Sequence, residues 1–264
     1  MSERFRALLA ERGVPPGGVV EHHPALASTN DRLRELSRLG APEWSVVVAD
    51  EQWAGRGRRG HGWASPAGNL FLSALLRPSL PPSAASLLPL AAGTAVSEAV
   101  GEWGVEAALK WPNDVLVGDR KLAGILVEST SGSSGIDSVV VGIGLNVGLD
   151  PRALGEPLAG LTTSLQWEAG RSADPLEVGA SVLARLAVWY HALGDGRGAA
   201  VLDAWRARSV PWWGREVEVR SGPAVLHGRA EGIDEAGSLL LRSAEGELLR
   251  VLSGEAREAR LVPS

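Results

Sequence analysis

The pattern of strand-like and helix-like segments changes once along the chain, and this change constrains the fold more than any other feature. Ahead of residue 210, apolar runs of strand length alternate irregularly with segments whose apolar residues recur at helical spacing. The absence of a regular strand–helix–strand repeat favours an α+β fold over a doubly wound parallel sheet. Beyond 210–214, only short strand-like runs separated by turn residues follow. We therefore expect a mixed domain over 1–212 and a small β-barrel over 213–264.

Local patterns place the elements of the first domain. A helix is predicted over 30–39, with Ser28 and Thr29 as its caps. The strands predicted at 46–49 and 70–76 flank a glycine-rich stretch, so we expect them to pair with that stretch as their connection. Further strands are predicted at 107–110, 115–117, 122–127 and 139–147, and further helices at 81–103, 175–193 and 199–208; the barrel strands are predicted at 217–219, 226–232, 239–242 and 248–252.

Composition removes several classes of function. The chain has no cysteine, which excludes disulfides, thiolate metal sites and a cysteine nucleophile. Its 26 Lys and Arg against 31 Asp and Glu give a net charge of −5, the wrong sign for a protein that coats nucleic acid or an anionic membrane. The longest uncharged stretch, 78–97, contains four prolines and does not fit a bilayer span, and no signal peptide fits residues 1–13. We expect a cytoplasmic protein.

Chemistry is concentrated first in a loop over residues 55–63, with the sequence GRGRRGHGW. Four glycines let its backbone approach a ligand closely, and three arginines in an acidic chain supply positive charge for a carboxylate or phosphate. The chain contains no Walker sequence. On composition alone, a solvated arginine-rich linker is the alternative.

Two further segments carry candidate groups. Lys121 follows the predicted Gly118-Asp119 turn at the head of a buried strand, a rigid support from which its ammonium can be aimed at a phosphoryl group. A lone lysine at a turn is more often simply exposed. Gly142 and Gly144 interrupt an apolar strand, which often marks close approach of a ligand or of another backbone. The third glycine of a dinucleotide fingerprint is missing there.

In this order, the segments resemble the biotin protein ligase family. The resemblance implies a mixed central sheet with flanking helices, the class II synthetase-like biotin/lipoate ligase core, followed by an SH3-like barrel. About two dozen residues precede Ser28, too few for a winged helix-turn-helix, so we expect the monofunctional type that binds no DNA. The matching segments are Ser28-Thr29-Asn30, 55–63, 110–114 with Lys121 and 124–126, 142–147, 163–165, 232–234 and 253–255.

The activity implied by the resemblance uses biotin and ATP as substrates. The family joins the biotin carboxylate to the α-phosphate of ATP, releases pyrophosphate, and passes biotin from biotinyl-5'-AMP to one lysine of a biotin carboxyl carrier protein domain. The resemblance further implies Mg²⁺ with the nucleotide and a carboxylase as partner. Dimers are common among relatives, so a homodimer is an open expectation.

The reaction brings two anions together, so the site needs cations that hold both. By resemblance, Lys121 bridges the biotin carboxylate and the α-phosphate, and Arg56 and Arg58 supply part of the positive field. Asp114 either orients the incoming acceptor lysine or helps to hold magnesium. These four residues are the predicted catalytic groups, and we expect no dedicated metal ligands.

Buried biotin needs partners for the donors and acceptor of its ureido ring. By resemblance, Ser28, Thr29, Asn30 and Gln52 supply them, although Ser28-Thr29-Asn30 alone is equally typical of a plain helix cap. The full predicted biotin set adds Gly55, Arg56, Gly57, Arg58, Lys121 and Gly124, and the predicted nucleotide set is Arg58, Arg59, Trp63, Asn113, Lys121 and Asn146.

The 55–63 loop is expected to fold over the adenylate, with Trp63 covering the adenine. His61 departs from the family, which usually carries another arginine there. Because neutral imidazole binds phosphate less well than guanidinium does, we expect the usual triphosphate contact to be weaker at His61, with Arg59 able to compensate.

Other functions remain as alternatives. A lipoate or octanoyl transferase shares a related catalytic core, but Gln52, the arginine loop and the C-terminal barrel favour biotin. A DNA-binding regulator would need the missing N-terminal domain. A non-catalytic module that reads peptide or nucleic acid with its barrel is opposed by the joint presence of Lys121 and the arginine loop.

Overall fold

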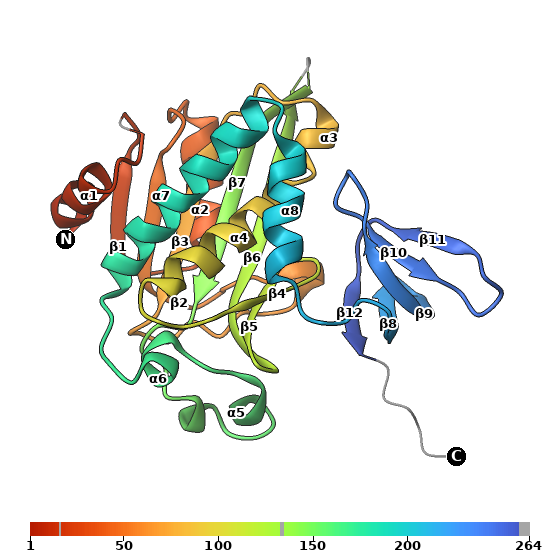
Figure 1. Cartoon of the computed structure of the whole chain (residues 1–264). Helices are drawn as coiled ribbons and strands as arrows, with labels where there is room; N and C mark the ends of the chain where they lie inside the picture. Colours follow the sequence, from red (N-terminus) through yellow and green to blue (C-terminus); the bar gives the residue numbers. More distant parts are fainter. Residues whose placement is uncertain (16, 133–134, 259–264) are drawn as a thin grey trace.

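The computed structural model describes residues 1–15, 17–132 and 135–258 and is built around one seven-stranded mixed sheet (Figure 1). The strand order is β1-β2-β3-β7-β6-β5-β4. Only β1 and β2 pair in parallel, and the other neighbours are antiparallel, so the predicted pairing of 46–49 with 70–76 is confirmed. The strands are β1 (Val20–Leu26), β2 (Val46–Gln52), β3 (Leu70–Leu76), β4 (Ala108–Lys110), β5 (Asp114–Val117), β6 (Arg120–Gly132) and β7 (Gly135–Leu145).

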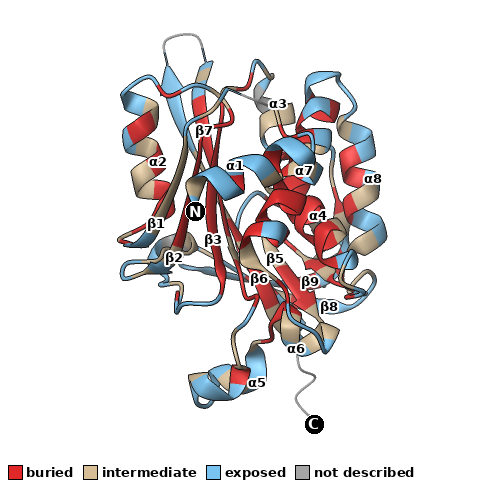
Figure 2. Ribbon diagram, turned by 90° about the vertical axis from the view of Figure 1, so that its left-hand side faces the viewer, coloured by how far each residue is buried: buried red, intermediate tan, exposed pale blue. Residues whose placement is uncertain are grey.

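Helices cover both faces of the sheet, which explains why its central strands carry long apolar runs (Figure 2). Every residue of β3 is buried. Alternate residues serve opposite faces: Val47 and Leu75 join a small cluster with α2 (Thr29–Arg38), whereas Val48 and Leu72 join the large core with α4 (Leu88–Gly101) and α7 (Pro175–Gly194). Ser28 follows the last residue of β1 by two positions, and the next N–H, of Thr29, donates to Gln52 at the end of β2. The start of α2 therefore lies close to the ends of both strands.

The helix predicted over 81–103 is divided into α3 (Pro82–Ala85) and α4. Pro89 lies in the first turn of α4, where its missing N–H is harmless; inside a continuous helix it would remove a hydrogen bond to the preceding turn. Within the described chain, Ser83–Gly101 is long and apolar enough to cross a membrane, yet 72% of its most apolar window is buried inside the protein. Its apolarity is therefore that of a core helix.

The N-terminal residues belong to the same domain. Helix α1 (Ser2–Glu11), which the sequence analysis did not predict, buries only Phe5 and Leu9 and packs on α7. The described residues ahead of Ser28 thus form α1 and β1, and not a winged helix-turn-helix.

A five-stranded antiparallel sheet follows α8 (Gly198–Arg208). Its last strand, β12, was not predicted, because its sequence EARE contains a single apolar residue, Ala256; pairing with β8 holds it in place. The buried side chains of this sheet are continuous with the main core, which Trp205 joins from α8. The strands, in the order β11-β10-β9-β8-β12, are β8 (Glu216–Ser221), β9 (Ala224–Ile233), β10 (Leu239–Arg242), β11 (Leu248–Val251) and β12 (Glu255–Glu258).

Candidate active site

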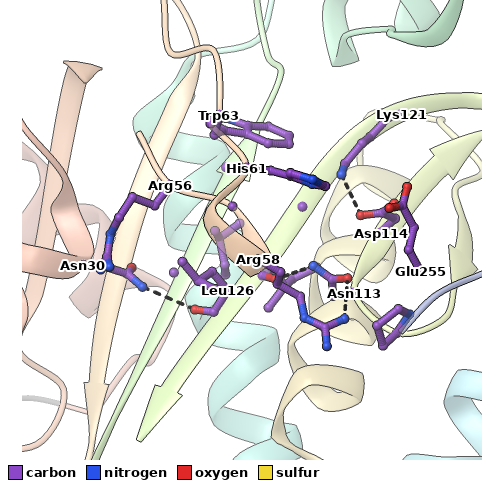
Figure 3. A pocket seen from close by; sticks show the side chains of 18 of the residues that line it. Asn30, Arg56, Arg58, His61, Trp63, Asn113, Asp114, Lys121, Leu126 and Glu255 are labelled. Atoms are coloured by element: carbon purple, nitrogen blue, oxygen red, sulfur yellow. Dashed lines mark hydrogen bonds and ion pairs between the residues drawn. The ribbon is translucent and has the colours of Figure 1, made fainter. Parts of the chain in front are cut away.

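A cavity of about 230 Å³ lies where the main sheet, the 55–63 loop and the C-terminal sheet meet (Figure 3). Its walls come from segments that are far apart in the sequence, including the start of α2, the β5–β6 hairpin and the segment before β12. Most of the predicted site residues line it: Ser28, Thr29, Asn30, Gln52, Arg56, Gly57, Arg58, Trp63, Asn113, Asp114, Lys121 and Gly124.

Three predicted residues differ from this set. Gly55 does not line the cavity, and a Cβ atom there would lie 2.5 Å from the carbonyl oxygen of Trp63, so glycine is needed where the loop crosses itself. Asn146 is buried behind the cavity, and its Nδ2 donates to the carbonyl oxygens of Thr163 at 3.0 Å and Lys121 at 3.4 Å. The side chain of Arg59 lies outside the described part of the structure. Their ligand contacts stay predictions.

The cavity also includes residues that sequence reasoning did not assign. Lys110 and Glu255 line it, as do Leu126 and Gly254. All four had a signal, since each lies in one of the matching segments 110–114 (sequence KWPND), 124–126 and 253–255. The apolar pattern of Leu126 adds nothing to it, because an apolar strand residue lining a cavity has the same sequence pattern as one buried in the core.

Lys121 is held by main-chain bonds and faces a carboxylate. The β5–β6 hairpin turns at Gly118, which has a φ of +57°, as the predicted turn requires. The Nζ of Lys121 lies 2.6 Å from Oδ1 of Asp114, and the Nζ of Lys110 lies 3.7 Å from its Oδ2. On the other side, the Thr163 N–H donates to the Lys121 carbonyl oxygen at 3.0 Å. Two ammonium groups thus share the Asp114 carboxylate.

Trp63 lies over two of the glycines that the sequence singled out. A Cβ at Gly144 would lie 2.6 Å from the indole Nε1, and one at Gly124 would lie 3.0 Å from Cζ3. The Nζ of Lys121 is 5.2 Å from the ring centroid, within cation–π range. The indole Nε1 is buried and has no hydrogen-bond partner among the described residues. The floor of the cavity is therefore flat and glycine-lined, and the loop itself covers it.

The loop arginines are held by protein acceptors. Arg56 Nη2 lies 2.9 Å from Oε2 of Glu128 and 2.8 Å from Oδ1 of Asp31, and it shares both carboxylates with Arg34. Arg58 Nη1 donates to Asn113 Oδ1 and to the Gly254 carbonyl oxygen, each at 3.3 Å. Arg58 therefore joins the loop to both the KWPND segment and the C-terminal sheet.

Asn30 lies at the opposite end of the cavity from Lys121 (Figure 3), and with Thr29 and Gln52, which also line the cavity, it forms a polar wall. Ser28 occupies the N-cap position of α2, but its side chain makes no capping hydrogen bond, so the predicted cap is wrong for its hydroxyl. Thr29 is the first helical residue, not a cap, and its N–H donates instead to Gln52 Oε1 at 2.8 Å. A Cβ at Gly142 would lie 2.1 Å from Asn30 Oδ1, so Gly142 makes room for this amide.

Comparison with known proteins identifies the class of protein to which this chain belongs. Residues 23–146 match the Biotin/lipoate A/B protein ligase family, and residues 213–256 match the Biotin protein ligase C terminal domain. The Biotin--[acetyl-CoA-carboxylase] ligase of Paracoccus denitrificans is 41% identical over 224 residues, which cover 83% of this chain and 92% of that protein. The Bifunctional ligase/repressor BirA of Escherichia coli (strain K12) is 34% identical over 242 residues, 90% of this chain and 74% of that protein.

Solved structures agree with this assignment. The biotin protein ligase from Aquifex aeolicus in complex with biotin and ATP superposes with a TM-score of 0.78 at 30% identity, covering 91% of this chain and 99% of that one. The fold is thus that of a biotin/lipoate ligase core with a C-terminal SH3-like domain, as the sequence predicted. Within that class, the chain belongs to the biotin protein ligase family, whose members are ATP-dependent ligases.

Proposed function

We propose that this protein activates biotin with ATP to give biotinyl-5'-AMP and pyrophosphate, and then transfers the biotinyl group to a lysine of a biotin carboxyl carrier domain. The observation that carries the proposal is the single cavity in which Lys121, the arginine loop and the polar wall meet. The Paracoccus relative is named for the second reaction, and the Aquifex structure contains both substrates.

In the first step, Lys121 must exchange the Asp114 carboxylate for the biotin carboxylate and the α-phosphate of ATP. A biotin carboxylate oxygen attacks the α-phosphorus, the bond to the bridging oxygen of the β-phosphate breaks, and pyrophosphate leaves. In this proposal the Lys121 ammonium leaves Asp114 to bind the biotin carboxylate and the α-phosphate, and so stabilises the charge that develops between them. Arg58 and Arg56 add positive charge from the loop, and Arg56 must first give up Glu128 and Asp31.

In the second step, the amine of the acceptor lysine attacks the biotinyl carbonyl carbon, AMP leaves, and the amine loses a proton. The two roles proposed for Asp114 differ here. As an orienting group it would accept a hydrogen bond from the acceptor amine, which requires that Lys121 has released it. As a magnesium ligand it would instead face the phosphates in the first step.

Magnesium is proposed as a companion of the nucleotide. Among the described residues, no three His, Asp or Glu side chains are grouped so that they could hold a metal ion by themselves. That suits Mg²⁺, which usually keeps several waters and binds one or two carboxylates together with substrate phosphates. Asp114 is the carboxylate that would take part, and the ion would supply charge neutralisation on the phosphates.

The polar wall is the observation that favours biotin over lipoate. Its amide and hydroxyl groups need polar partners when a ligand buries them, and biotin's ureido ring has both donors and an acceptor. A site built to hydrogen-bond its substrate can reject an analogue without those groups by ~10⁴–10⁵. The dithiolane ring of lipoate offers no such groups.

The remaining proposals concern the domain boundaries, the protein partner, the cellular location and the oligomeric state. We divide the chain into a catalytic domain over 1–212 and an SH3-like domain over 213–264, supported by the family match that begins at residue 213. A biotin-dependent carboxylase is the proposed partner, supported by the name of the Paracoccus relative. We also propose a cytoplasmic protein without DNA or membrane partners, supported by the net charge of −5, and keep the homodimer as a proposal.

Exchange of labelled pyrophosphate into ATP tests the proposed function. We expect exchange that depends on biotin and is absent with lipoate or octanoate. Transfer of biotin to a purified carrier domain would then test the second step. Exchange driven by lipoate or octanoate, with none from biotin, would instead assign the chain to the transferase alternative.

A further inference from the structure

Ser73 is the one polar residue of β3, and it lies next to the cavity without lining it. Its side chain is fully buried, and its Oγ lies 2.6 Å from Oδ1 of Asn30 and 2.8 Å from Oγ1 of Thr29. Both neighbours belong to the polar wall. A hydroxyl in the middle of a central strand is costly unless it is hydrogen-bonded, so the directions of these two bonds matter.

The surroundings of Asn30 settle the direction of the first bond. Its Nδ2 faces two acceptors, Oε2 of Glu128 at 2.8 Å and the Leu126 carbonyl oxygen at 3.4 Å. The Oδ1 atom therefore faces Ser73, and an amide oxygen can only accept a hydrogen bond. A serine hydroxyl has a single hydrogen, so Ser73 donates it to Asn30.

The second contact of Ser73 must then use the hydrogen of Thr29. Two oxygens 2.8 Å apart need a hydrogen between them, and the Thr29 hydroxyl supplies the only one left. The other neighbour of Thr29 Oγ1 is Gln52 Oε1, at 3.2 Å, which is also an acceptor.

The orientation of the Gln52 amide is fixed in turn. Its Oε1 accepts the N–H of Thr29 at 2.8 Å, and its Nε2 donates to Ser65 Oγ at 3.1 Å. The Ser65 hydroxyl donates onward to the Trp63 carbonyl oxygen at 3.0 Å. The Thr29 hydrogen, placed between Thr29 and Ser73, therefore points into the protein, and the Thr29 hydroxyl can meet a ligand only with its lone pairs.

We propose that Ser73 is a positioning residue that sets ligand specificity: it keeps the Thr29 hydroxyl turned inward as a hydrogen-bond acceptor, so the cavity selects a ring N–H over an isosteric ring oxygen. Turning the Thr29 hydrogen toward a ligand would leave the Ser73 and Thr29 oxygens in contact without a hydrogen. The inference rests on the proposed function, because it takes the cyclic urea of biotin as the ligand.

Calorimetric titration without ATP tests this inference separately from catalysis. The probes are biotin and the two cyclic carbamates in which one ring N–H of biotin is replaced by oxygen. For the unmodified protein we expect at least one carbamate to bind roughly 10- to 100-fold more weakly than biotin. The loss arises because the ring oxygen of the carbamate and the Thr29 oxygen are both acceptors and cannot form a hydrogen bond. In Ser73→Ala the Thr29 hydroxyl keeps only its longer 3.2 Å contact with Gln52 Oε1, which already accepts the Thr29 N–H, so the hydroxyl can turn to a ligand acceptor and this ratio should fall to about threefold or less.

A double-mutant comparison separates positioning from general loss of structure. In a Thr29→Ala background the ratio should already be low, and adding Ser73→Ala should leave it unchanged, because Ser73 acts through Thr29. Ser97→Ala is the matched control: this buried serine on α4 donates to the Ala107 carbonyl oxygen at 2.7 Å, outside the cavity. It should lower the melting temperature without changing the ratio.

The outcomes are distinguishable. If Ser73→Ala does not fold, Ser73→Cys keeps a weak donor of similar size, and an intermediate ratio supports the proposal. A folded Ser73 variant with an unchanged ratio, or effects of Ser73→Ala and Thr29→Ala that simply add, would overturn the role of Ser73 while leaving biotin binding intact. Failure of the unmodified protein to bind biotin would instead refute the proposed function.

Discussion

The two cationic parts of the cavity are held in different ways. Lys121 belongs to a strand paired with β5, and its carbonyl oxygen accepts a further main-chain bond from Thr163. Within the 55–63 loop the backbone bonds are local, such as the Gly57 N–H to the His61 carbonyl oxygen at 2.7 Å. The loop contacts the rest of the cavity through side chains: arginines reach Glu128 and Asn113 among others, and Trp63 lies against Gly124 and Gly144.

This difference implies that Lys121 and the 55–63 loop have different roles. Moving the backbone of Lys121 would break sheet hydrogen bonds, whereas moving the loop requires that guanidinium groups change partners and that the Trp63 indole leaves the glycines beneath it. A fixed backbone support suits an amine that must exchange Asp114 for two reacting groups at a defined place. A releasable cover suits a site that must admit substrates and then protect a reactive adenylate from water.

The largest effect is expected from the fixed part. Lys121→Ala should lower biotin-dependent pyrophosphate release by ~10²–10³, because it removes a preorganised donor at the reacting centre. Arg120→Ala, one position away and paired with Glu168 at 2.8 Å, is the control and should keep most of the activity. Release within about tenfold of the unmodified protein in Lys121→Ala would show that the amine is not the bridging group.

Arg58→Gly tests the releasable part. It removes the bonds to Asn113 and Gly254, so adenylate formation should persist while free biotinyl-adenylate appears in solution about tenfold faster. The measurement is chromatography of labelled product after rapid separation from the protein. Arg197→Gly, an exposed arginine paired with Asp195, serves as control. Retention of the adenylate as tight as in the unmodified protein would contradict the lid.

Gly144→Ala tests the surface on which the loop rests. The new methyl group would lie 2.6 Å from the Trp63 indole, so the ring must leave the glycine floor. We expect ligand affinity to fall about tenfold while stability changes by less than ~1 kcal/mol, because the loop can shift. Gly93→Ala, whose Cβ would make only an ordinary 3.5 Å contact with Leu109, should leave affinity unchanged. Titration measures the ligand affinity, and thermal unfolding measures the stability. Unchanged affinity in Gly144→Ala would show that ligand binding does not depend on Trp63 lying against Gly144.

The smallest effect is expected at the ion pairs that hold Arg56. Asp31→Asn removes one of its two carboxylates, but the Asp31 side chain is 40% exposed and Glu128 remains, so the free energy of unfolding should fall by less than ~1 kcal/mol. Urea denaturation checks this value. A loss above ~3 kcal/mol would mean that the loop is held as firmly as the hairpin, and the distinction between them would fail.

Local signals predicted much of the fold and the site. The β5–β6 hairpin followed from its turn residues, and Lys121 at its head faces the cavity. The glycines of β7 were correctly linked to close approach, but the approaching groups are the amide of Asn30 and the indole of Trp63. The signal in a glycine is the missing side chain, which says nothing about the group that fills the space.

Other features had no local signal. The break between α3 and α4 depends on one proline in an otherwise helical pattern, and β12 depends on pairing with β8 more than on its own composition. Asn146 lies in a segment that resembles the family, yet it bonds behind Lys121 and does not line the cavity. Membership of a motif and contact with a cavity are different properties.

The sequence by itself determined the chemical groups available here: no thiol, a cluster of arginines between glycines, a lysine after a tight turn, and short polar residues at the start of a helix. The tertiary structure alone decided which of them meet and how each is oriented. It placed Arg56 beside two carboxylates and aligned Ser73, Thr29 and Asn30 into one hydrogen-bond chain. The reason is physical: a donor or a charge is a property of one residue, whereas its direction and its partner depend on strands and helices brought together from distant parts of the chain.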